Sequence, residues 1–249
     1  MELQDKTIII TGASSGIGAA AARLFAEEGA NLVLGARRAG ALEAVAAGIG
    51  SRAVTLAGDV RDPGYAEALV ARATAAFGGL DGALNNVGTV GAMTPVAEMT
   101  RATWDEVIAV NLTSAFLAAR AQLPALHTRG GGSIVFTASF VGFSNGGLPG
   151  MGAYAAAKAG VIGLVRSLAA EHAAEGIRVN ALLPGGTITP MGGEDDPDAQ
   201  AFIAGLHPMK RMASAREIAQ GALYLLGDRS AFMTGSPMIV DGGMSVRLL

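Results

Sequence analysis

The sequence predicts one α/β domain built on an open, mostly parallel, doubly wound β-sheet. Short apolar runs of β-forming residues alternate with alanine-rich amphipathic segments, which is the rhythm of successive βαβ units. The runs are continuously apolar instead of alternating with polar residues, as expected where helices cover both faces of a sheet. The 249 residues contain no linker-like stretch, so a single domain spanning residues 1–249 is expected.

The individual elements follow from this alternation. We expect strands at Thr7–Thr11, Asn31–Leu34, Ala53–Ala57, Gly82–Asn85, Ser133–Thr137, Arg178–Leu183 and near Met238–Val240. We expect helices at Gly16–Glu28, Gly40–Gly48, around Ala66–Phe77, in a long stretch reaching about Leu126, from Tyr154 to about Ala174, and near Arg216–Leu226. Helical crossovers between successive strands make the sheet parallel.

Two stretches interrupt the alternation and are expected to be loops. Residues 140–152 are rich in glycine, and residues 185–210 contain the acidic run Glu194–Asp198. Ligands of open α/β sheets bind beyond the carboxyl ends of the strands, where both stretches emerge, so both are predicted to border the substrate. The second is a candidate lid, and a merely solvated acidic loop is the alternative.

The composition excludes several classes of function. A formal charge of −3 without a basic tract argues against nucleic-acid or anionic-membrane partners. The absence of cysteine excludes disulfides, thiolate catalysis and cysteine zinc sites. No signal peptide is visible and every apolar stretch falls short of about 18 residues, so a cytoplasmic protein with no membrane partner is expected. With 51% hydrophobic and 16% charged residues, a homo-oligomer, tetramer or dimer, is expected.

A glycine-rich turn joins the first expected strand to the first helix. It reads Thr11-Gly-Ala-Ser-Ser-Gly-Ile-Gly18. Free backbone N–H groups and the positive end of a helix at such a turn can hold a diphosphate. The spacing is Gly-x3-Gly-x-Gly, which differs from the Gly-x-Gly-x2-Gly fingerprint of dinucleotide-binding units.

The same turn matches Gly-x-Ser-x-Gly, the nucleophile elbow of serine hydrolases, with Ser14 as nucleophile. That mechanism needs a later histidine, and His127 and His172 fall within expected helices, which leaves His207. An elbow on the first strand also has no preceding loop to complete an oxyanion hole, so hydrolysis is a remote alternative. The three histidines are too scattered for a metal site, and no metal is predicted.

Tyr154 and Lys158 stand four residues apart in a segment expected to be helical, so they share one helix face. An ammonium favours the ionised form of a nearby phenol, whose ordinary pKa is about 10. A second positive charge, such as an oxidised nicotinamide, would add to the effect. The pair predicts an acid/base catalyst beside a nucleotide, against the alternative of a half-buried tyrosine near a surface lysine.

Taken in order, these motifs resemble the classical short-chain dehydrogenase/reductase family over nearly the whole chain. The resemblance is carried by the Thr11–Gly18 turn, Asn85-Asn86-Val87-Gly88, Asn111, Ser139, Tyr154-x-x-x-Lys158 and Pro184-Gly185. It implies a Rossmann-type sheet of seven strands with helices on both faces, a nicotinamide cofactor, and oxidation or reduction at an alcohol or carbonyl.

The resemblance also implies catalytic roles. Tyr154 would act as the general acid/base, and Lys158 would lower its pKa and hold the nicotinamide ribose. Ser139 would hydrogen-bond the reacting oxygen, and Asn111 would hold a water that relays protons towards Lys158. Asn85 fits a structural role between strands better than a catalytic one.

The cofactor contacts implied by the resemblance come from six parts of the chain. They are Gly12, Ser14, Ser15, Gly16, Ile17 and Gly18 at the turn, Arg37 and Arg38 after the second strand, Asp59 and Val60 at the adenine, Asn86, Val87 and Gly88 after the fourth strand, and Pro184, Gly185, Thr187 and Thr189 near the nicotinamide and diphosphate, together with Tyr154 and Lys158. Val87, Thr187 and a longer spacing from Ser139 to Tyr154 depart from the family's usual pattern.

The end of the second strand favours NADP(H) over NAD(H). It reads Gly35-Ala36-Arg37-Arg38, so the acidic residue that would bind a ribose 2′-hydroxyl is missing and two arginines follow. Arginine suits a 2′-phosphate because its guanidinium donates in a fork. Against NADP(H), Ser15 stands at a position where a second basic residue often helps to bind the 2′-phosphate. The alternative is that the two arginines are only a charge pair at the start of a helix.

The expected substrate is an apolar or cyclic ketone or alcohol. Its predicted walls are Met93, Phe140, Phe143, Met151, Met191 and Phe202. The leading hypothesis is an NADP(H)-dependent carbonyl reductase or alcohol dehydrogenase. A dinucleotide-binding regulatory or scaffold protein without turnover is the alternative from another class.

Overall fold

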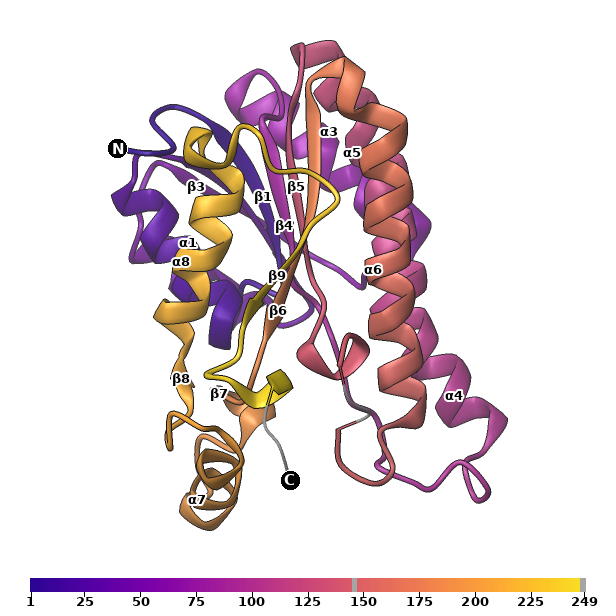
Figure 1. The fold of residues 1–249 in the computed structure, drawn as a ribbon. Coiled ribbons are helices and arrows are strands. Elements are labelled where there is room, and N and C mark those ends of the chain that lie inside the picture. The colour runs from indigo at the N-terminus through magenta and orange to yellow at the C-terminus, as the bar shows by residue number, and fades with distance from the viewer. Residues whose placement is uncertain (145–146, 247–249) are drawn as a thin grey trace.

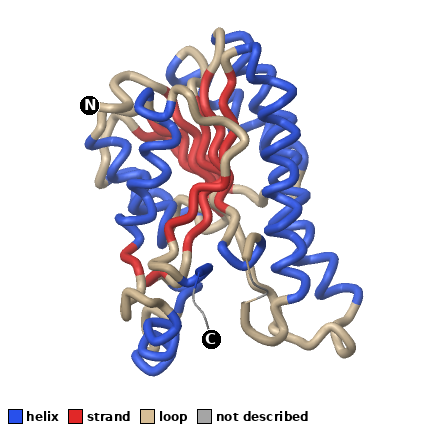
Figure 2. The backbone as a smooth tube through the Cα atoms, in the orientation of Figure 1, coloured by secondary structure: helices blue, strands red, loops and turns tan. Residues whose placement is uncertain are grey.

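The sheet of this protein is parallel throughout and has seven strands. The computed structural model describes residues 1–144 and 147–246. The strands are β1 (Thr7–Thr11), β2 (Asn31–Ala36), β3 (Ala53–Ala57), β4 (Gly82–Asn85), β5 (Gly132–Thr137), β6 (Ile177–Pro184) and β9 (Pro237–Val240). Their spatial order is β3-β2-β1-β4-β5-β6-β9, and helices flank the sheet (Figure 1; Figure 2). The predicted doubly wound α/β fold is therefore confirmed.

Helices cover both faces of the sheet. The helices of the described residues are α1 (Gly16–Glu27), α2 (Ala39–Ala47), α3 (Pro63–Phe77), α4 (Arg101–Ile108), α5 (Ser114–Arg129), α6 (Gly152–His172), α7 (Pro197–Leu206) and α8 (Ala215–Leu226). Helices α1 and α8 pack together over one face, and α3, α5 and α6 cover the other (Figure 1).

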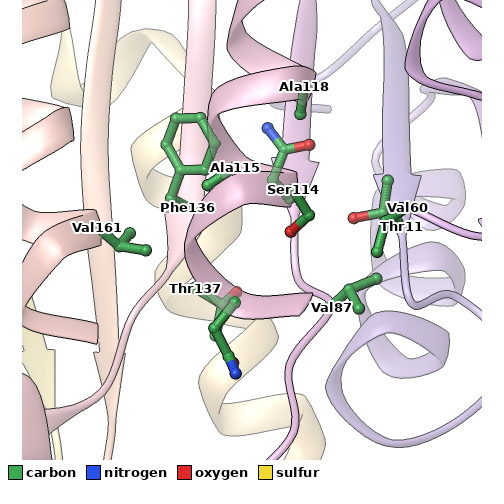
Figure 3. Close-up of a pocket in the computed structure, with 11 residues that line it drawn as sticks. Thr11, Val60, Val87, Ser114, Ala115, Ala118, Phe136, Thr137 and Val161 are labelled. Carbon is green, nitrogen blue, oxygen red and sulfur yellow. The ribbon is translucent and has the colours of Figure 1, made fainter. Parts of the chain in front are cut away.

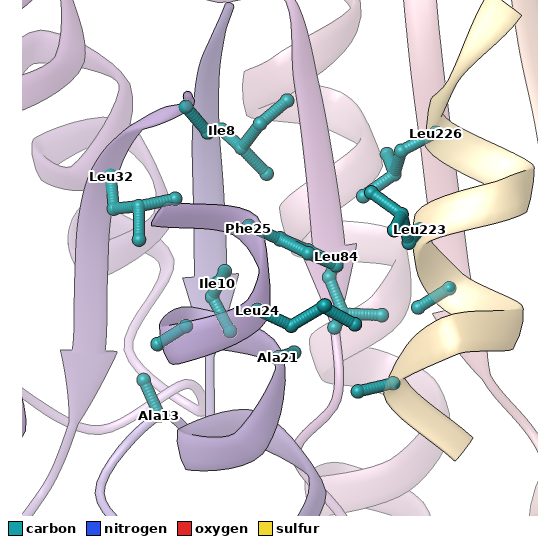
Figure 4. Close-up of a cluster of buried hydrophobic side chains, with 14 of the residues drawn as sticks. Ile8, Ile10, Ala13, Ala21, Leu24, Phe25, Leu32, Leu84, Leu223 and Leu226 are labelled. Atoms are coloured by element: carbon teal, nitrogen blue, oxygen red, sulfur yellow. The ribbon is translucent and has the colours of Figure 1, made fainter. Parts of the chain in front are cut away.

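Each face has its own hydrophobic core. Successive strand residues point to opposite faces, so Ile8 and Ile10 belong to the core under α1 and α8 while Ile9 belongs to the other. Figure 4 shows the first core, in which Phe25 and Leu223 approach the strands from the two helices. Both faces are buried, which is the physical reason for the continuously apolar strands.

The strand order reverses at β1, which pairs with β2 on one side and with β4 on the other. At such a switch point the connections leave in opposite directions and open a crevice beyond the carboxyl ends of the strands. The turn after β1 and the segment after β4 both emerge here.

The long helix expected to reach Leu126 is two helices separated by a π-helical turn at Ala109–Thr113. The Asn111 amide donates to the Val107 carbonyl at 2.8 Å, and the Ser114 hydroxyl donates to the Val110 carbonyl at 2.6 Å. Side chains that bond to backbone carbonyls in this way compete with regular helical bonds. The π-turn thereby carries Asn111 into the interior.

The stretch 185–210 is more ordered than the predicted loop. Short strands β7 (Thr187–Ile188) and β8 (Ala213–Ser214) pair in parallel, and α7 lies between them. The Asp196 carboxylate accepts from the backbone N–H groups of Asp198 and Ala199, and Pro197 follows at the first helical position. An N-cap residue followed by proline indicates the start of a helix, and the prediction of a loop, based on the acidic charge of this run, missed that signal.

The other expected loop, 140–152, begins with a 3-10 turn at Phe140–Gly142, and residues 145 and 146 of it lie outside the described residues. Within the described part of the chain, one helical stretch, Gly152–Glu175, is long and apolar enough to cross a membrane by length and composition. Half of the most apolar 18 residues of this stretch are buried inside the protein. Val161, Ile162 and Val165 face the sheet there, as in a core helix.

Candidate active site

The glycine turn after β1 leaves no space for side chains. Gly12 and Gly16 have φ angles of 70° and 52°, in the left-handed region that favours glycine. A Cβ on Gly16 would lie 3.1 Å from Cγ2 of Thr189, and one on Gly18 would collide with the Gly12 carbonyl. The structure therefore brings Thr189 against the turn, as predicted for a residue near the diphosphate.

The first amides of α1 are available to a ligand. Ser15 stands at the N-cap with extended backbone angles and makes no capping bond with its side chain. The N–H groups of a helix's first turn have no partner within the helix. A close, glycine-lined approach to such N–H groups suits an anionic diphosphate, so the residues present fit a dinucleotide cofactor.

Arg38 borders the same turn. Its guanidinium lies 3.0 Å from the Ser15 hydroxyl and 3.4 Å from that of Ser14, and it donates to both. Ala36 is buried at the end of β2, and Arg37 beside it is exposed. Of the two arginines predicted to bind the cofactor, Arg38 thus lies at the turn, and Arg37 is exposed next to it in sequence, with no carboxylate at position 36.

Asp59, predicted at the adenine, is paired within its own loop. The Arg61 guanidinium approaches its carboxylate to 2.6 Å. The hydrogen bond from this side chain is the largest cause that lowers the pKa of Asp59. Its oxygens accept from Arg61 in this state, and an adenine amino group would share them.

The segment after β4 packs against the turn. The Asn86 N–H donates to the Thr11 hydroxyl at 3.1 Å, and the Thr137 hydroxyl donates to Oδ1 of Asn86 at 3.0 Å. A Cβ on Gly88 would lie 3.0 Å from Oδ1 of Asn111 and 3.3 Å from Nζ of Lys158. Gly88 therefore lies where Asn111 and Lys158 converge.

Asn85 forms a buried amide pair that the sequence did not reveal. Its Nδ2 donates to Oε1 of Gln122, and the Gln122 Nε2 donates to Oδ1 of Asn85, both at 2.9 Å. The pair ties β4 to α5, in keeping with the structural role expected of Asn85. Gln122 carried no sequence signal beyond its place on a helix.

The proposed acid/base group lies at the start of α6. The Tyr154 phenol is hydrogen-bonded to the Ser139 side chain, which follows β5. The Lys158 ammonium lies 5.6 Å from the centre of the Tyr154 ring and donates to the Thr137 carbonyl at 2.7 Å. The structure thus brings Ser139, Tyr154 and Lys158 together.

Burial dominates the electrostatics of this group. It raises the pKa of Tyr154, which the Ser139 hydrogen bond lowers only in part, and it lowers the pKa of Lys158 to about 8. In the protein alone, desolvation of the buried phenol outweighs its hydrogen bond to Ser139 and sets the direction of the Tyr154 pKa. The role of Lys158 in lowering this pKa stays a prediction.

A small cavity of about 20 Å³ lies behind the crevice between β4, β5 and α5 (Figure 3). Its polar lining includes Thr11, Asn85, Asn111, Ser114 and Thr137. A cavity of this size with several polar partners has room for about one water molecule.

Large apolar side chains are exposed on the segments that follow the carboxyl ends of β4, β5 and β6. Met93, Phe143, Met191 and Phe202, all predicted as substrate walls, are between 47% and 56% exposed. Phe140 is buried instead, at 9% exposure, because it opens the 3-10 turn that packs on α6. That turn also contacts the C-terminal turn Met244–Val246, which the sequence did not assign to the site.

The remaining predicted cofactor residues line the exit of β6. Pro184 ends the strand, and the Gly185 N–H donates to the Val240 carbonyl at 3.0 Å. The Thr187 hydroxyl donates to the Gly185 carbonyl at 3.0 Å. Elsewhere, Ile17 lies in the first turn of α1, and Val60 and Val87 lie in the segments that follow β3 and β4.

The histidines are engaged away from Ser14. His172 bonds to Glu175 at 3.0 Å, and the more exposed His127 approaches the same carboxylate to 3.4 Å. His207 is buried and bonds to Gly186 and Ile203. In residues 1–144 and 147–246, no three His, Asp or Glu side chains are grouped to hold a metal ion.

A Rossmann-type sheet with a glycine turn and a tyrosine-lysine pair at one crevice defines a class of dinucleotide-dependent enzymes. The model of the family described as enoyl-(acyl carrier protein) reductase matches residues 12–245. The crystal structure of levodione reductase superimposes with a TM-score of 0.92 at 36% identity, covering 99% of this chain and 100% of the other.

Relatives of known activity match over the same length. The 2,5-dichloro-2,5-cyclohexadiene-1,4-diol dehydrogenase of Sphingobium indicum is 41% identical over 248 residues, 98% of each chain. The cyclohexanol dehydrogenase of an Acinetobacter species is 36% identical over 244 residues, 97% of this chain and 95% of the relative. The chain belongs to the short-chain dehydrogenase/reductase family of oxidoreductases, whose cofactors are NAD(H) or NADP(H).

Proposed function

We propose that this protein is an NADP(H)-dependent dehydrogenase/reductase that interconverts a carbonyl and a secondary alcohol on an apolar, cyclic substrate. The observation that carries the proposal is the meeting of Ser139, Tyr154 and Lys158 beside the glycine turn. These three side chains come from the segment after β5 and from α6, and a protein that only binds a dinucleotide has no need of the set.

A bound nicotinamide would supply a hydride to the substrate carbon or accept one from it, and its oxidised ring would add a positive charge. Tyr154 donates its phenolic proton to the carbonyl oxygen in reduction and accepts the alcohol proton in oxidation. Ser139 hydrogen-bonds the same oxygen and stabilises its developing negative charge. With a pKa of about 8, Lys158 is mostly protonated at neutral pH, so its charge favours the phenolate when oxidation requires it.

Asn111 completes the proton path in this proposal. Its Oδ1 lies near Gly88 and Lys158 and accepts from the Thr89 N–H at 3.2 Å. Both of its amide hydrogens go to the Thr89 and Val107 carbonyls, which holds the side chain in place. A water beside Asn111 would connect Lys158 with the polar cavity behind it.

The cyclic substrate class rests on two independent supports. The relatives named for a cyclohexadienediol and for cyclohexanol are enzymes of cyclic alcohols. Met93, Phe143, Met191 and Phe202 are exposed on the segments that follow β4, β5 and β6, and they would favour an apolar ligand because burying them removes apolar area from water.

The main experiment follows cofactor absorbance with a panel of cyclic and open-chain alcohols and ketones. Tyr154→Phe should lower kcat about 10²- to 10⁴-fold, the usual contribution of a general acid/base, while cofactor binding persists. Tyr224→Phe on α8 is the matched control and should leave kcat unchanged. Full turnover by Tyr154→Phe would exclude the assigned acid, and a wild-type protein inactive on every substrate would favour a binding protein.

The preference for NADP(H) is supported by Ala36 and the two arginines at the end of β2. The Arg38 guanidinium already lies at the serines of the turn, and Arg37 is exposed beside it. Replacing Ala36 with Asp and Arg37 with Leu should shift the ratio of kcat/KM values towards NAD(H). An unchanged ratio would contradict the assignment of the 2′-phosphate to this edge.

We further propose that the protein is a cytoplasmic homo-oligomer, a dimer or tetramer. Fully exposed Phe232 and half-exposed Phe116 support the oligomer, since large apolar surface is commonly covered by another subunit. Light scattering during size exclusion measures the mass directly. A monomer at micromolar concentration would rule the oligomer out.

A further inference from the structure

His207 joins two segments of the candidate site through the two nitrogens of one ring. It follows the last residue of α7 and is 2% exposed. Its Nδ1 lies 2.8 Å from the Ile203 carbonyl, and its Nε2 lies 3.0 Å from the Gly186 backbone nitrogen. The Gly186 N–H can only donate, so Nε2 accepts and Nδ1 carries the hydrogen.

The first of these bonds secures the end of α7. The carbonyl groups in the last turn of a helix have no partner within the helix, and Ile203 belongs to that turn of α7. The Nδ1–H of His207 supplies the missing donor. The ring therefore fixes the carboxyl end of the helix that carries Phe202.

The second bond secures the loop that follows β6. Gly186 lies between Gly185 and Thr187, both assigned to the nicotinamide end of the cofactor. Its carbonyl accepts from the Ala213 N–H at 2.9 Å, and a Cβ at Gly186 would lie 2.6 Å from Cε1 of His207. The loop is thus held on both sides by the segment that follows α7.

We propose that His207 is a positioning residue that couples the placement of α7 to the cofactor-facing loop Gly185–Thr187. The ring is buried against both segments, so a displacement of the loop by bound cofactor is transmitted to the helix. His207 touches neither substrate nor cofactor in this proposal, which rests on the proposed function for the identity of the ligand.

Two pairs of substitutions separate the acceptor from the volume of the ring. His207→Gln places a carbonyl oxygen near the position of Nε2 and can accept from Gly186. His207→Asn is one methylene shorter and reaches only the position of Nδ1. His207→Leu keeps apolar volume without a polar atom, and His127→Leu, at an exposed histidine of α5, is the control.

The measurement is hydrogen exchange of α7, read by mass spectrometry with and without NADPH, together with NADPH affinity from its fluorescence. NADPH should slow exchange of residues 197–206 in the wild type, His207→Gln and His127→Leu. The protection of α7 by NADPH should fall about three- to tenfold in His207→Asn, the range expected for losing the one hydrogen bond to Gly186, and at least as much in His207→Leu, which loses both hydrogen bonds. If His207→Leu fails to fold, the Gln and Asn pair carries the comparison.

Steady-state kinetics supply the second reading. His207→Leu and His207→Asn should raise the substrate KM more than they lower kcat. His207→Gln should have KM and kcat values close to those of the wild type. Equal protection of α7 in wild type and Leu, or equal loss in Gln and Asn, overturns the coupling. NADPH that binds wild type without slowing α7 also overturns it, whereas NADPH that fails to bind contradicts the proposed function itself and this proposal with it.

Discussion

The buried ammonium of Lys158 makes the stability of this protein depend on pH in a way that one substitution removes. Lys158 is 3% exposed, and burial lowers its pKa from 10.5 to about 8. Between these two values the unfolded chain binds the proton that the folded protein has released. Stability therefore rises with pH through this window, and below pH 8 the cost of burying the charge is fully present.

The magnitude follows from the size of the shift. A change of about 2.5 pKa units corresponds to about 3 kcal/mol. About 2 kcal/mol of this is relieved between pH 7 and pH 9.5, because pH 9.5 still lies one unit below the unfolded pKa of 10.5 and the rest of the shift is relieved only above it. Lys158→Met keeps most of the apolar stem without the charge. Wild type should therefore gain about 2 kcal/mol relative to this variant over that interval.

Urea unfolding at both pH values measures the difference. Protein concentration is held constant, since association of subunits would change the apparent stability. Lys210→Met removes an exposed ammonium and is the control, for which wild type and variant should change in parallel. Parallel behaviour of Lys158→Met and wild type would refute the burial argument.

Three further substitutions test the packing around the site. Gln122→Leu leaves the Asn85 amide buried without its partner. It should therefore lower the free energy of unfolding in urea by about 2–3 kcal/mol. An unchanged free energy of unfolding would show that the amide pair does not stabilise the fold. Arg178→Met removes the guanidinium that donates to the carbonyls of Leu225, Leu226 and Gly227 at the end of α8. It should lower the free energy of unfolding in urea by about 1–3 kcal/mol. A change near zero would mean that water replaces the donor. Gly142→Ala places a Cβ 2.5 Å from the Lys158 carbonyl carbon and should lower kcat/KM about 10- to 100-fold by displacing α6, and wild-type kinetics would contradict this close packing.

Strand positions could be predicted closely because their information is local. The bounds of β3 and β4 agree with the expected Ala53–Ala57 and Gly82–Asn85, since glycine and aspartate interrupt the apolar runs on either side. Helix α7 was missed although Asp196 and Pro197 mark its start, because the acidic character of the run was given more weight than its capping pattern.

The residues of the candidate site also fall into those that local sequence predicts and those whose roles depend on tertiary contacts. The spacing of Tyr154 and Lys158 is a local property of one helix, and the structure has them on one face as expected. Gln122 and His207 could not be assigned, because their roles depend on which segment lies across from them. The direction of the Tyr154 pKa also depended on burial, which a spacing of four residues does not specify.

By itself the sequence determined the alternation of strands and helices, the glycine turn and the composition of the acid/base pair, because each depends on residues within a few positions of one another. Only the tertiary structure decided that Thr189 packs on Gly16 and that His207 holds Gly186, since these contacts join segments 173 and 21 residues apart. It also decided how far each ionisable group is removed from water. Desolvation sums over every segment packed around a group, so it exists only once the chain has folded.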